Sequence, residues 1–232
     1  MVRAILAKQK HQTRRVAPVE HLSIREIGGG VCWEAKFSKP VRSRVSGGMA
    51  VGTYSGGPFT PEQVASIVAS DFCPYGVRGD RLWVRETWRH TASSVEEARA
   101  ITEDIASGTA VDYRATYIEQ CMRELGFSRE DAEVADSFEV WRPSIHMPRW
   151  ASRITLDIAG VRVERLRDIS ESDALAEGIV QLKDGGYGLP AGEHYHSADP
   201  RQSYFSLWEA INGPGSVEAN PWVWVVEFPY FA

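Results

Sequence analysis

An acidic, helix-favouring block between two strand-like segments constrains the fold of this chain most strongly. Residues 91–140 contain twelve Asp or Glu residues and four Arg residues, which gives the block a formal charge of −8. Its Ser94-Val95-Glu96-Glu97 stretch has the pattern of a capping box, in which a hydroxyl and a carboxylate satisfy free amides at a helix start. We therefore predict an acidic helical insertion at 91–140, with most of its charges on a solvated face.

The segments around this block predict strands and short helices in a mixed order. Residues 79–86 begin with a Gly-Asp turn that leads into a strand, and residues 154–166 begin with alternating apolar side chains, as strands do. Ser170 and Asp199 precede two later helices, and residues 222–228 predict an apolar closing strand. Because strands and helices do not alternate regularly, this order favours an α+β fold with a small curved sheet or β-barrel and flanking helices.

The length of 232 residues and the hydrophobic content of 43% predict a single globular domain at 1–232, with a Gly-rich loop insertion at 181–198. No apolar run approaches the length of a membrane span, and the run before Lys8 is too short for a secretion signal. The three cysteines are far apart in the sequence and form neither a disulfide framework nor a metal-binding pair. We therefore expect a cytoplasmic protein without a membrane partner.

The N-terminal basic segment is the first candidate for a functional site. The first fifteen residues contain Arg3, Lys8, Lys10, Arg14 and Arg15 and no acid, although the formal charge of the whole chain is −5. Its lysines and arginines can bind a phosphate backbone, because ammonium and guanidinium groups match anionic oxygens. Alternatively, Lys10 can activate the hydroxyl of Thr13, because a lysine with a lowered pKa can accept a hydroxyl proton. A basic terminus without a specific role has the same composition.

The stretch at 141–153 is the second candidate, because it combines two Trp, three Arg and one His with two Pro. Arginine binds phosphate and tryptophan stacks on bases, so this composition suits a nucleic-acid groove. The alternative is a buried loop whose Trp side chains fill the core, and the two readings can apply to different residues. The predicted nucleic-acid contacts are Lys8, Arg14, Arg15, Arg85, Arg142, His146, Arg149, Trp150 and Arg153.

Two further features concern single side chains. Glu177 is predicted at the C-terminal end of a helix, where the helix dipole disfavours a carboxylate, and this placement hints at a function. His194 and His196 alternate in the Gly-rich loop, but no further ligand follows at a defined spacing. We therefore predict a polar loop there, and no metal or other cofactor.

Five segments, taken together, resemble the ASCH-domain family of the PUA-like superfamily, particularly its larger phage and prophage members. They occur in the family's order and cover about half of the chain. The resemblance implies a β-barrel-like fold with flanking helices and a cleft suited to RNA or modified nucleosides. The segments are Val2 to Ala7 with Lys10 to Arg15, Gly79 to Trp88, Trp141 to Arg153, Ile169 to Ile179, and Phe205 to Phe228.

One branch of small ASCH proteins hydrolyses N4-acetylcytidine and related acylated cytosines. Its motif is a Lys, a Thr three residues later, and a Glu on a helix after the central strand, and Lys10, Thr13 and Glu177 match it. The resemblance implies Thr13 as the nucleophile, Lys10 as its activating base, and Glu177 in proton transfer or positioning. The segments at 91–140, 141–153 and 181–198 have no counterpart in the minimal enzymes, so the substrate pocket can differ.

Other functions are compatible with the same residues. The main alternative is a PUA-like module that binds RNA through its basic side chains without chemistry, with an affinity that falls steeply with salt. A ribonuclease that uses a lysine, His11 and His146 for acid–base work is also open, although no spacing signature supports it. A virion-assembly role is suggested only by the phage-like resemblance.

Overall fold

The computed structural model describes residues 2–27, 30–45, 49–50, 52–55, 61–103, 110–190 and 192–229. The chain divides into two compact units. Unit 1 contains Arg3–Leu82 and Asp157–Ala232, and unit 2 contains Trp83–Leu156.

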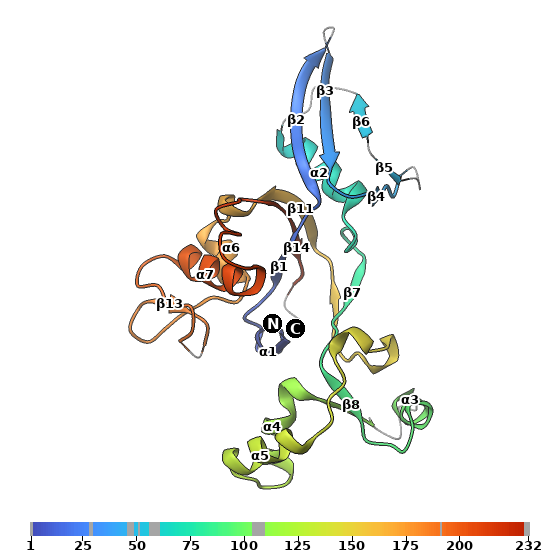
Figure 1. Cartoon of the computed structure of the whole chain (residues 1–232), viewed down its shortest axis with the longest axis vertical. Coiled ribbons are helices and arrows are strands. Elements are labelled where there is room, and N and C mark those ends of the chain that lie inside the picture. The colour runs from blue at the N-terminus through green and yellow to red at the C-terminus, as the bar shows by residue number, and fades with distance from the viewer. Residues whose placement is uncertain are drawn as a thin grey trace. The chain divides into compact units, whose positions relative to one another are not determined.

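Helices and strands are mixed along the chain (Figure 1). The α-helices are α1 (Val2–Leu6), α2 (Pro61–Phe72), α3 (Val95–Glu103), α4 (Arg114–Glu124), α5 (Arg129–Phe138), α6 (Glu171–Ala176) and α7 (Pro200–Asn212). The 3-10 helices are η1 (Ser144–His146), η2 (Arg149–Ala151) and η3 (Leu166–Asp168). The strands are β1 (Gln12–Val16), β2 (Val19–Ile27), β3 (Gly30–Phe37), β4 (Val41–Arg42), β5 (Met49–Ala50), β6 (Gly52–Ser55), β7 (Arg81–Trp83), β8 (Trp88–His90), β9 (Val111–Tyr113), β10 (Thr155–Asp157), β11 (Gly160–Arg165), β12 (Val180–Gln181), β13 (Tyr187–Gly188) and β14 (Trp222–Glu227).

The centre of unit 1 is a three-stranded antiparallel sheet with β14 between β1 and β11 (Figure 1). Arg14 of β1 and Arg162 of β11 both lie opposite Val225 of β14. Since directly opposite residues share a face and successive residues alternate, these three side chains belong to one face. Trp224 and Val226 belong to the other face.

Each face of this sheet has its own apolar core. Val225 belongs to a buried cluster with Tyr204 and Trp208 of α7. Trp224 belongs to a different cluster, which includes Val68 of α2. Helix α7, together with α6, therefore covers the face that carries Arg14, and α2 covers the opposite face.

Unit 2 contains the helices α3 to α5 and the paired strands β8 and β9. Arg89 of β8 holds these parts together: it donates a hydrogen bond of 2.9 Å to Asp112 of β9 and forms an ion pair with Glu139 after α5. Its guanidinium also lies 5.1 Å from the ring centre of Tyr117 and 5.6 Å from that of Trp141. The positive charge of Arg89 thus connects several segments of the predicted acidic insertion.

The chain passes between the units at β7 and β10, which pair with each other. Arg81 of β7 donates a hydrogen bond of 3.1 Å to Asp157 of β10. Unit 2 therefore begins and ends at neighbouring positions of a two-stranded ladder.

The α+β class and the helical insertion at 91–140 are confirmed, since the insertion contains α3, α4 and α5. It also contains the unpredicted strand β9. The described residues form separate small sheets and no closed barrel. The predicted loop at 181–198 contains strand, since β12 and β13 lie in or beside it. This loop is Gly-rich, and pairing of the two strands with each other overrides that local composition.

None of the helices in the described parts of the chain is both long and apolar enough to cross a membrane.

We expect Leu166→Ala to lower the free energy of unfolding by about 2–5 kcal/mol, because it leaves a cavity in the core beneath α7. Leu166 is fully buried in the cluster that contains Tyr204 and Val225. Chemical denaturation measures this loss. Val45→Ala is the control, since Val45 is 87% exposed and its truncation should change stability by about 0.5 kcal/mol or less. Equal effects of the two substitutions would contradict the assignment of this core.

Candidate functional site

Backbone hydrogen bonds place Lys10 beside the end of α6. The amide of Lys10 donates to the carbonyl of Ala4, and the amide of His11 donates to the carbonyl of Ala176, both within 3.1 Å. Helix α6 ends at Gly178, whose φ of +102° favours glycine. A Cβ at this glycine would lie 3.5 Å from the Cβ of Lys10, so the two segments are in van der Waals contact.

The side chains of Lys10 and Glu177 form a buried ion pair. Their exposed fractions are 8% and 3%. The ammonium also donates a hydrogen bond of 2.8 Å to the backbone carbonyl of Glu177. Glu177 is the C-cap of α6, so the predicted carboxylate at the unfavourable end of the helix dipole is compensated by a lysine.

The environment lowers the pKa of Lys10 below the ordinary value of a lysine. The main cause is burial, which disfavours the charged ammonium. The positive charges of Arg15 and Arg14 act in the same direction, and the carboxylate of Glu177 opposes them. A lysine with a lowered pKa is the type that accepts a proton from a hydroxyl or from water.

Arg14 holds the other oxygen of Glu177. Its side chain is fully buried, and Nη1 donates a hydrogen bond of 3.3 Å to Oε1 of Glu177. Nη2 lies 2.6 Å from Oε1 of Glu164 and 3.2 Å from Oδ2 of Asp173. One guanidinium thus binds three carboxylates from β11, α6 and the end of α6. A buried charge needs such partners, because its removal from water costs several kcal/mol.

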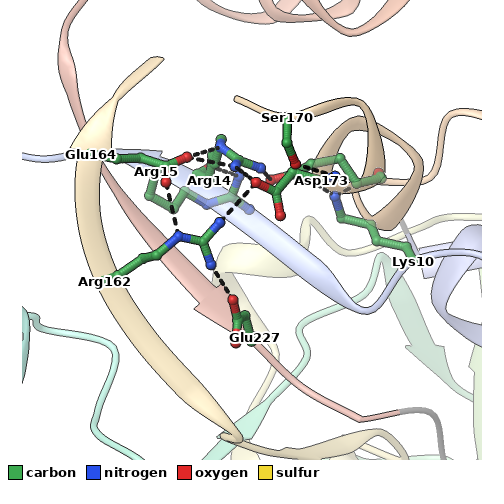
Figure 2. Close-up of polar contacts among 9 residues, drawn as sticks. Lys10, Arg14, Arg15, Arg162, Glu164, Ser170, Asp173 and Glu227 are labelled. Carbon is green, nitrogen blue, oxygen red and sulfur yellow. Dashed lines mark hydrogen bonds and ion pairs between the residues drawn. The ribbon is translucent and has the colours of Figure 1, made fainter. Parts of the chain in front are cut away.

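Arg162 extends this arrangement on the same face of the sheet (Figure 2). It donates hydrogen bonds to Glu164 (2.8 Å) and Asp173 (3.0 Å), and it pairs with Glu227 at the end of β14. The resulting charge network contains three cations and four carboxylates, which are Lys10, Arg14, Arg162, Glu164, Asp173, Glu177 and Glu227.

The ion pair of Lys10 and Glu177 lines a pocket of about 180 Å³ in unit 1. Thr13 lines the same pocket, so the structure brings the three predicted catalytic residues to one place. In the part of the chain that the structure describes, no hydrogen bond joins the Thr13 hydroxyl to Lys10. The alternation of β1 assigns Thr13 and Arg14 to opposite faces of the strand. Because β1 is the edge strand of its sheet, Thr13 can still reach the pocket from that edge.

The opposite wall of the pocket is largely apolar and comes from α7 and the loop before it. Its residues include Leu189, Leu207, Trp208 and Ile211, with Asn212 at the end of the helix. Tyr204 also lines it, and its ring centre lies 5.9 Å from the guanidinium carbon of Arg14. Burial, followed by the nearby charge of Glu177, raises the pKa of Tyr204, so its hydroxyl stays protonated.

The predicted nucleic-acid residues of unit 1 have different environments. Lys8 is exposed in the turn after α1, with a φ of +57°. Arg15 is exposed and lines the pocket, and its Nη1 donates to the carbonyl of Arg14. Arg14 itself is buried, so its guanidinium serves internal carboxylates and is not presented on the surface.

In unit 2, the predicted contacts are mostly engaged by neighbouring side chains. Arg85 lies 4.6 Å from the ring centre of Trp83, and Arg142 lies 3.0 Å from Nε2 of His90. Arg149 donates a hydrogen bond of 3.0 Å to the hydroxyl of Thr155. The other three predicted residues are His146, which is exposed at the end of η1, half-buried Trp150, which packs edge-to-face on Trp88, and Arg153, which pairs with Glu86.

The two histidines of the Gly-rich loop have structural partners. Nδ1 of His194 lies 2.9 Å from the hydroxyl of Ser206, and Nδ1 of His196 accepts a hydrogen bond from the amide of Asp199. Among the described residues, no group of three or more His, Cys, Asp or Glu side chains has the arrangement of a metal site.

Sequence reasoning missed Arg162, Glu164 and Asp173, which support Glu177 through Arg14. The sequence contains a signal for two of these residues, Arg162 and Glu164. Arg162 and Glu164 are two residues apart in a segment predicted as strand, so they share a face. Charged side chains on one face of a strand whose other face is apolar indicate a charge cluster beneath that face.

Comparison with known proteins gave no match to any family model, curated protein or solved structure.

We expect Arg14→Met to lower the free energy of unfolding by about 3–5 kcal/mol, because it leaves buried carboxylates without their shared cation. Arg81→Met removes a charge whose side chain is 75% exposed and should cost about 1 kcal/mol or less. Denaturant titrations of both variants measure the difference. A loss for Arg14→Met that is no larger than that for Arg81→Met would show that the network contributes little to stability.

The network also predicts a dependence of stability on acid pH. Burial alone raises the pKa of Asp173, but Arg162 and Arg14 outweigh it, so the pKa of this carboxyl lies below its usual value. The stabilisation is therefore complete above the ordinary pKa of aspartate, about 3.9, and is lost as the pH falls through the lower pKa of the folded state.

Asp173→Asn should consequently lower stability at pH 7 and reduce the decline in stability between about pH 5 and pH 2. Unfolding titrations across this range test the expectation. Asp157→Asn removes a carboxylate of an exposed pair and should leave the decline almost unchanged. The same pH profile for Asp173→Asn and the wild type would rule out a role of Asp173 in acid sensitivity.

Proposed function

We propose that the protein is an amidohydrolase that removes the acyl group from N4-acylated cytidine or a closely related modified pyrimidine nucleoside, free or within RNA. The observation that carries the proposal is the buried Lys10–Glu177 pair at a pocket that Thr13 also lines. Burial lowers the pKa of Lys10, as a general base requires. The resemblance to the ASCH family supports the same three residues and the same substrate class.

The reaction begins with a proton transfer within the ion pair. Lys10 passes a proton to Glu177, which leaves a neutral amine beside a neutral carboxylic acid in the buried site. The amine then takes the proton of the Thr13 hydroxyl while the oxygen attacks the acyl carbon of the amide. The C–N bond breaks, and the proton on Lys10 moves to the departing N4 amine.

Hydrolysis of the acyl-threonine completes the cycle. Lys10 removes a proton from water, the hydroxide attacks the ester carbon, and the proton returns to the oxygen of Thr13 as the acid departs. Glu177 then returns its proton to Lys10. Arg14 holds Oε1 of Glu177, so the carboxyl keeps its position through both halves of the reaction.

The lining of the pocket suits a small acyl group beside a planar ring. The wall formed by Leu207, Trp208 and Ile211 offers apolar contact, while Arg15 and Asn212 offer polar groups at the same pocket. Pockets for small ligands combine an apolar lining with a few such polar groups. Lys8 and Arg15 are exposed on the same unit and can contact the phosphates of an RNA substrate.

We expect Lys10→Ala to lower kcat/KM for N4-acetylcytidine by about 100-fold or more, since general-base catalysis contributes about 10²–10⁴-fold. Release of cytidine from a panel of N4-acylcytosines measures the effect. Lys39→Ala is the control, because Lys39 is exposed and does not line the pocket. No cytidine release by the wild type, together with salt-dependent RNA binding, would favour a non-catalytic RNA-binding module.

Two substitutions of Thr13 distinguish between two forms of the mechanism. If Thr13 is the nucleophile, Thr13→Ala should abolish turnover and Thr13→Ser should retain part of it, because serine keeps the hydroxyl. Mass spectrometry of the stopped reaction should also detect the acyl-enzyme. Full activity of Thr13→Ala would instead assign the attack to a water molecule activated by Lys10.

A further inference from the structure

Unit 2 contains a pocket of its own that the proposed hydrolysis does not use. Its volume is about 540 Å³, and its lining comes from the end of α3, from β9, from α4 and from the segment 150–153. This volume lies in the range of about 300–1,000 Å³ that is usual for small-molecule sites. Every described residue that lines the pocket belongs to unit 2.

A fixed arginine lines this pocket. Arg153 donates two hydrogen bonds, of 3.0 and 2.9 Å, to the carboxylate of Glu86, whose side chain is only 1% exposed. Its guanidinium carbon also lies 4.0 Å from the ring centre of Tyr113. Within the described part of the chain, these contacts leave Nη1 without a hydrogen-bond partner. A pre-organised donor of this kind can bind a ligand acceptor with little loss of side-chain entropy.

An aromatic side chain lines the same pocket. Trp150 is half-buried, and its ring packs edge-to-face on Trp88 with the centres 5.9 Å apart. Contact with Trp88 fixes the indole, which also lines the pocket. Planar heterocycles stack on tryptophan and on guanidinium planes.

The charges around the pocket disfavour an anion. Among the described residues, its lining contains the bases Arg123 and Arg153 and the acids Asp112, Glu119 and Glu124, which gives a formal charge of −1. Counting Glu86, the partner of Arg153, and Arg89, the partner of Asp112, leaves this sum unchanged.

One carboxylate remains available for a ligand. Asp112 pairs with Arg89 and Glu124 pairs with Arg123, whereas Glu119 has no partner among the residues that the structure describes. A neutral ligand with both amine donors and ring acceptors satisfies Glu119 and Arg153 together, and a phosphate does not.

We propose that this pocket binds the base of a nucleoside that carries an exocyclic amine, which is adenosine, cytidine or guanosine. The ring stacks on Trp150, the exocyclic amine donates to Glu119, and a ring nitrogen or carbonyl accepts from Arg153. Carboxylates and arginines read base edges in this way in many nucleic-acid complexes. The site does not depend on the amidohydrolase activity of unit 1, and its ligand need not be a substrate.

Calorimetric titration of the full chain with adenosine, cytidine, guanosine and uridine tests the proposal. We expect saturable binding of the three amine-bearing nucleosides and weaker binding of uridine. Glu119→Gln should weaken binding about 10-fold, since it replaces a charged hydrogen-bond acceptor with a neutral one. Glu133→Gln is the control, because Glu133 is an exposed glutamate of α5 outside the pocket.

Binding to Lys10→Ala distinguishes this pocket from the one in unit 1. Adenosine should bind Lys10→Ala as tightly as the wild type, whether or not the wild type hydrolyses any acylated cytosine. The proposal would be overturned if no nucleoside bound, if uridine bound equally well, or if Glu119→Gln had no effect. Displacement of adenosine by inorganic phosphate would assign the pocket to anions, and displacement by spermidine would assign it to simple amines; either result contradicts a base-recognition site.

Discussion

The buried guanidinium of Arg14 is the constraint on which the rest of unit 1 depends. A fully buried arginine is tolerated only where carboxylates surround it, and here they come from the far edge of the sheet and from the helix that covers it. Strand β11 supplies Glu164, helix α6 supplies Asp173, and the end of that helix supplies Glu177. The need to neutralise one charge therefore specifies how β1, β11 and α6 pack against one another. Hydrogen bonds to a guanidinium have preferred directions, whereas apolar contacts do not.

The same constraint links stability to chemistry. With one oxygen of Glu177 held by Arg14, the other is available to Lys10. The amine is thereby enclosed between a carboxylate and a well-packed helix end, where water solvates its positive charge poorly. A lysine in this setting has a lower pKa than one in solvent. The segments that the network holds together thus also bury Lys10, which lowers its pKa.

Local patterns in the sequence predicted much of this arrangement. Caps and turn residues located α6 and α7, the alternation at the start of 154–166 located the segment of β10 and β11, and an apolar run located β14, because these signals act over a few residues. The convergence of Lys10, Thr13 and Glu177 on one pocket was predicted only through family resemblance. The burial of Arg14 and the pairing of Arg153 with Glu86 depend on contacts between distant segments, and composition alone favoured an exposed, RNA-facing role for both arginines. Strands β9, β12 and β13 were missed because pairing with other strands, and not their own composition, stabilises them.

Pairing of β7 with β10 means that the chain leaves unit 1 and returns to it at adjacent points. Seventy-four residues, 83–156, therefore occupy the position of a connection between two neighbouring strands. Insertions at such places are tolerated, because the host needs no rearrangement of its own core. The segments that carry Lys10, Thr13 and Glu177 all lie outside this insertion. The inserted module can accordingly be exchanged, enlarged or deleted while the sheet that positions these three side chains keeps its own core.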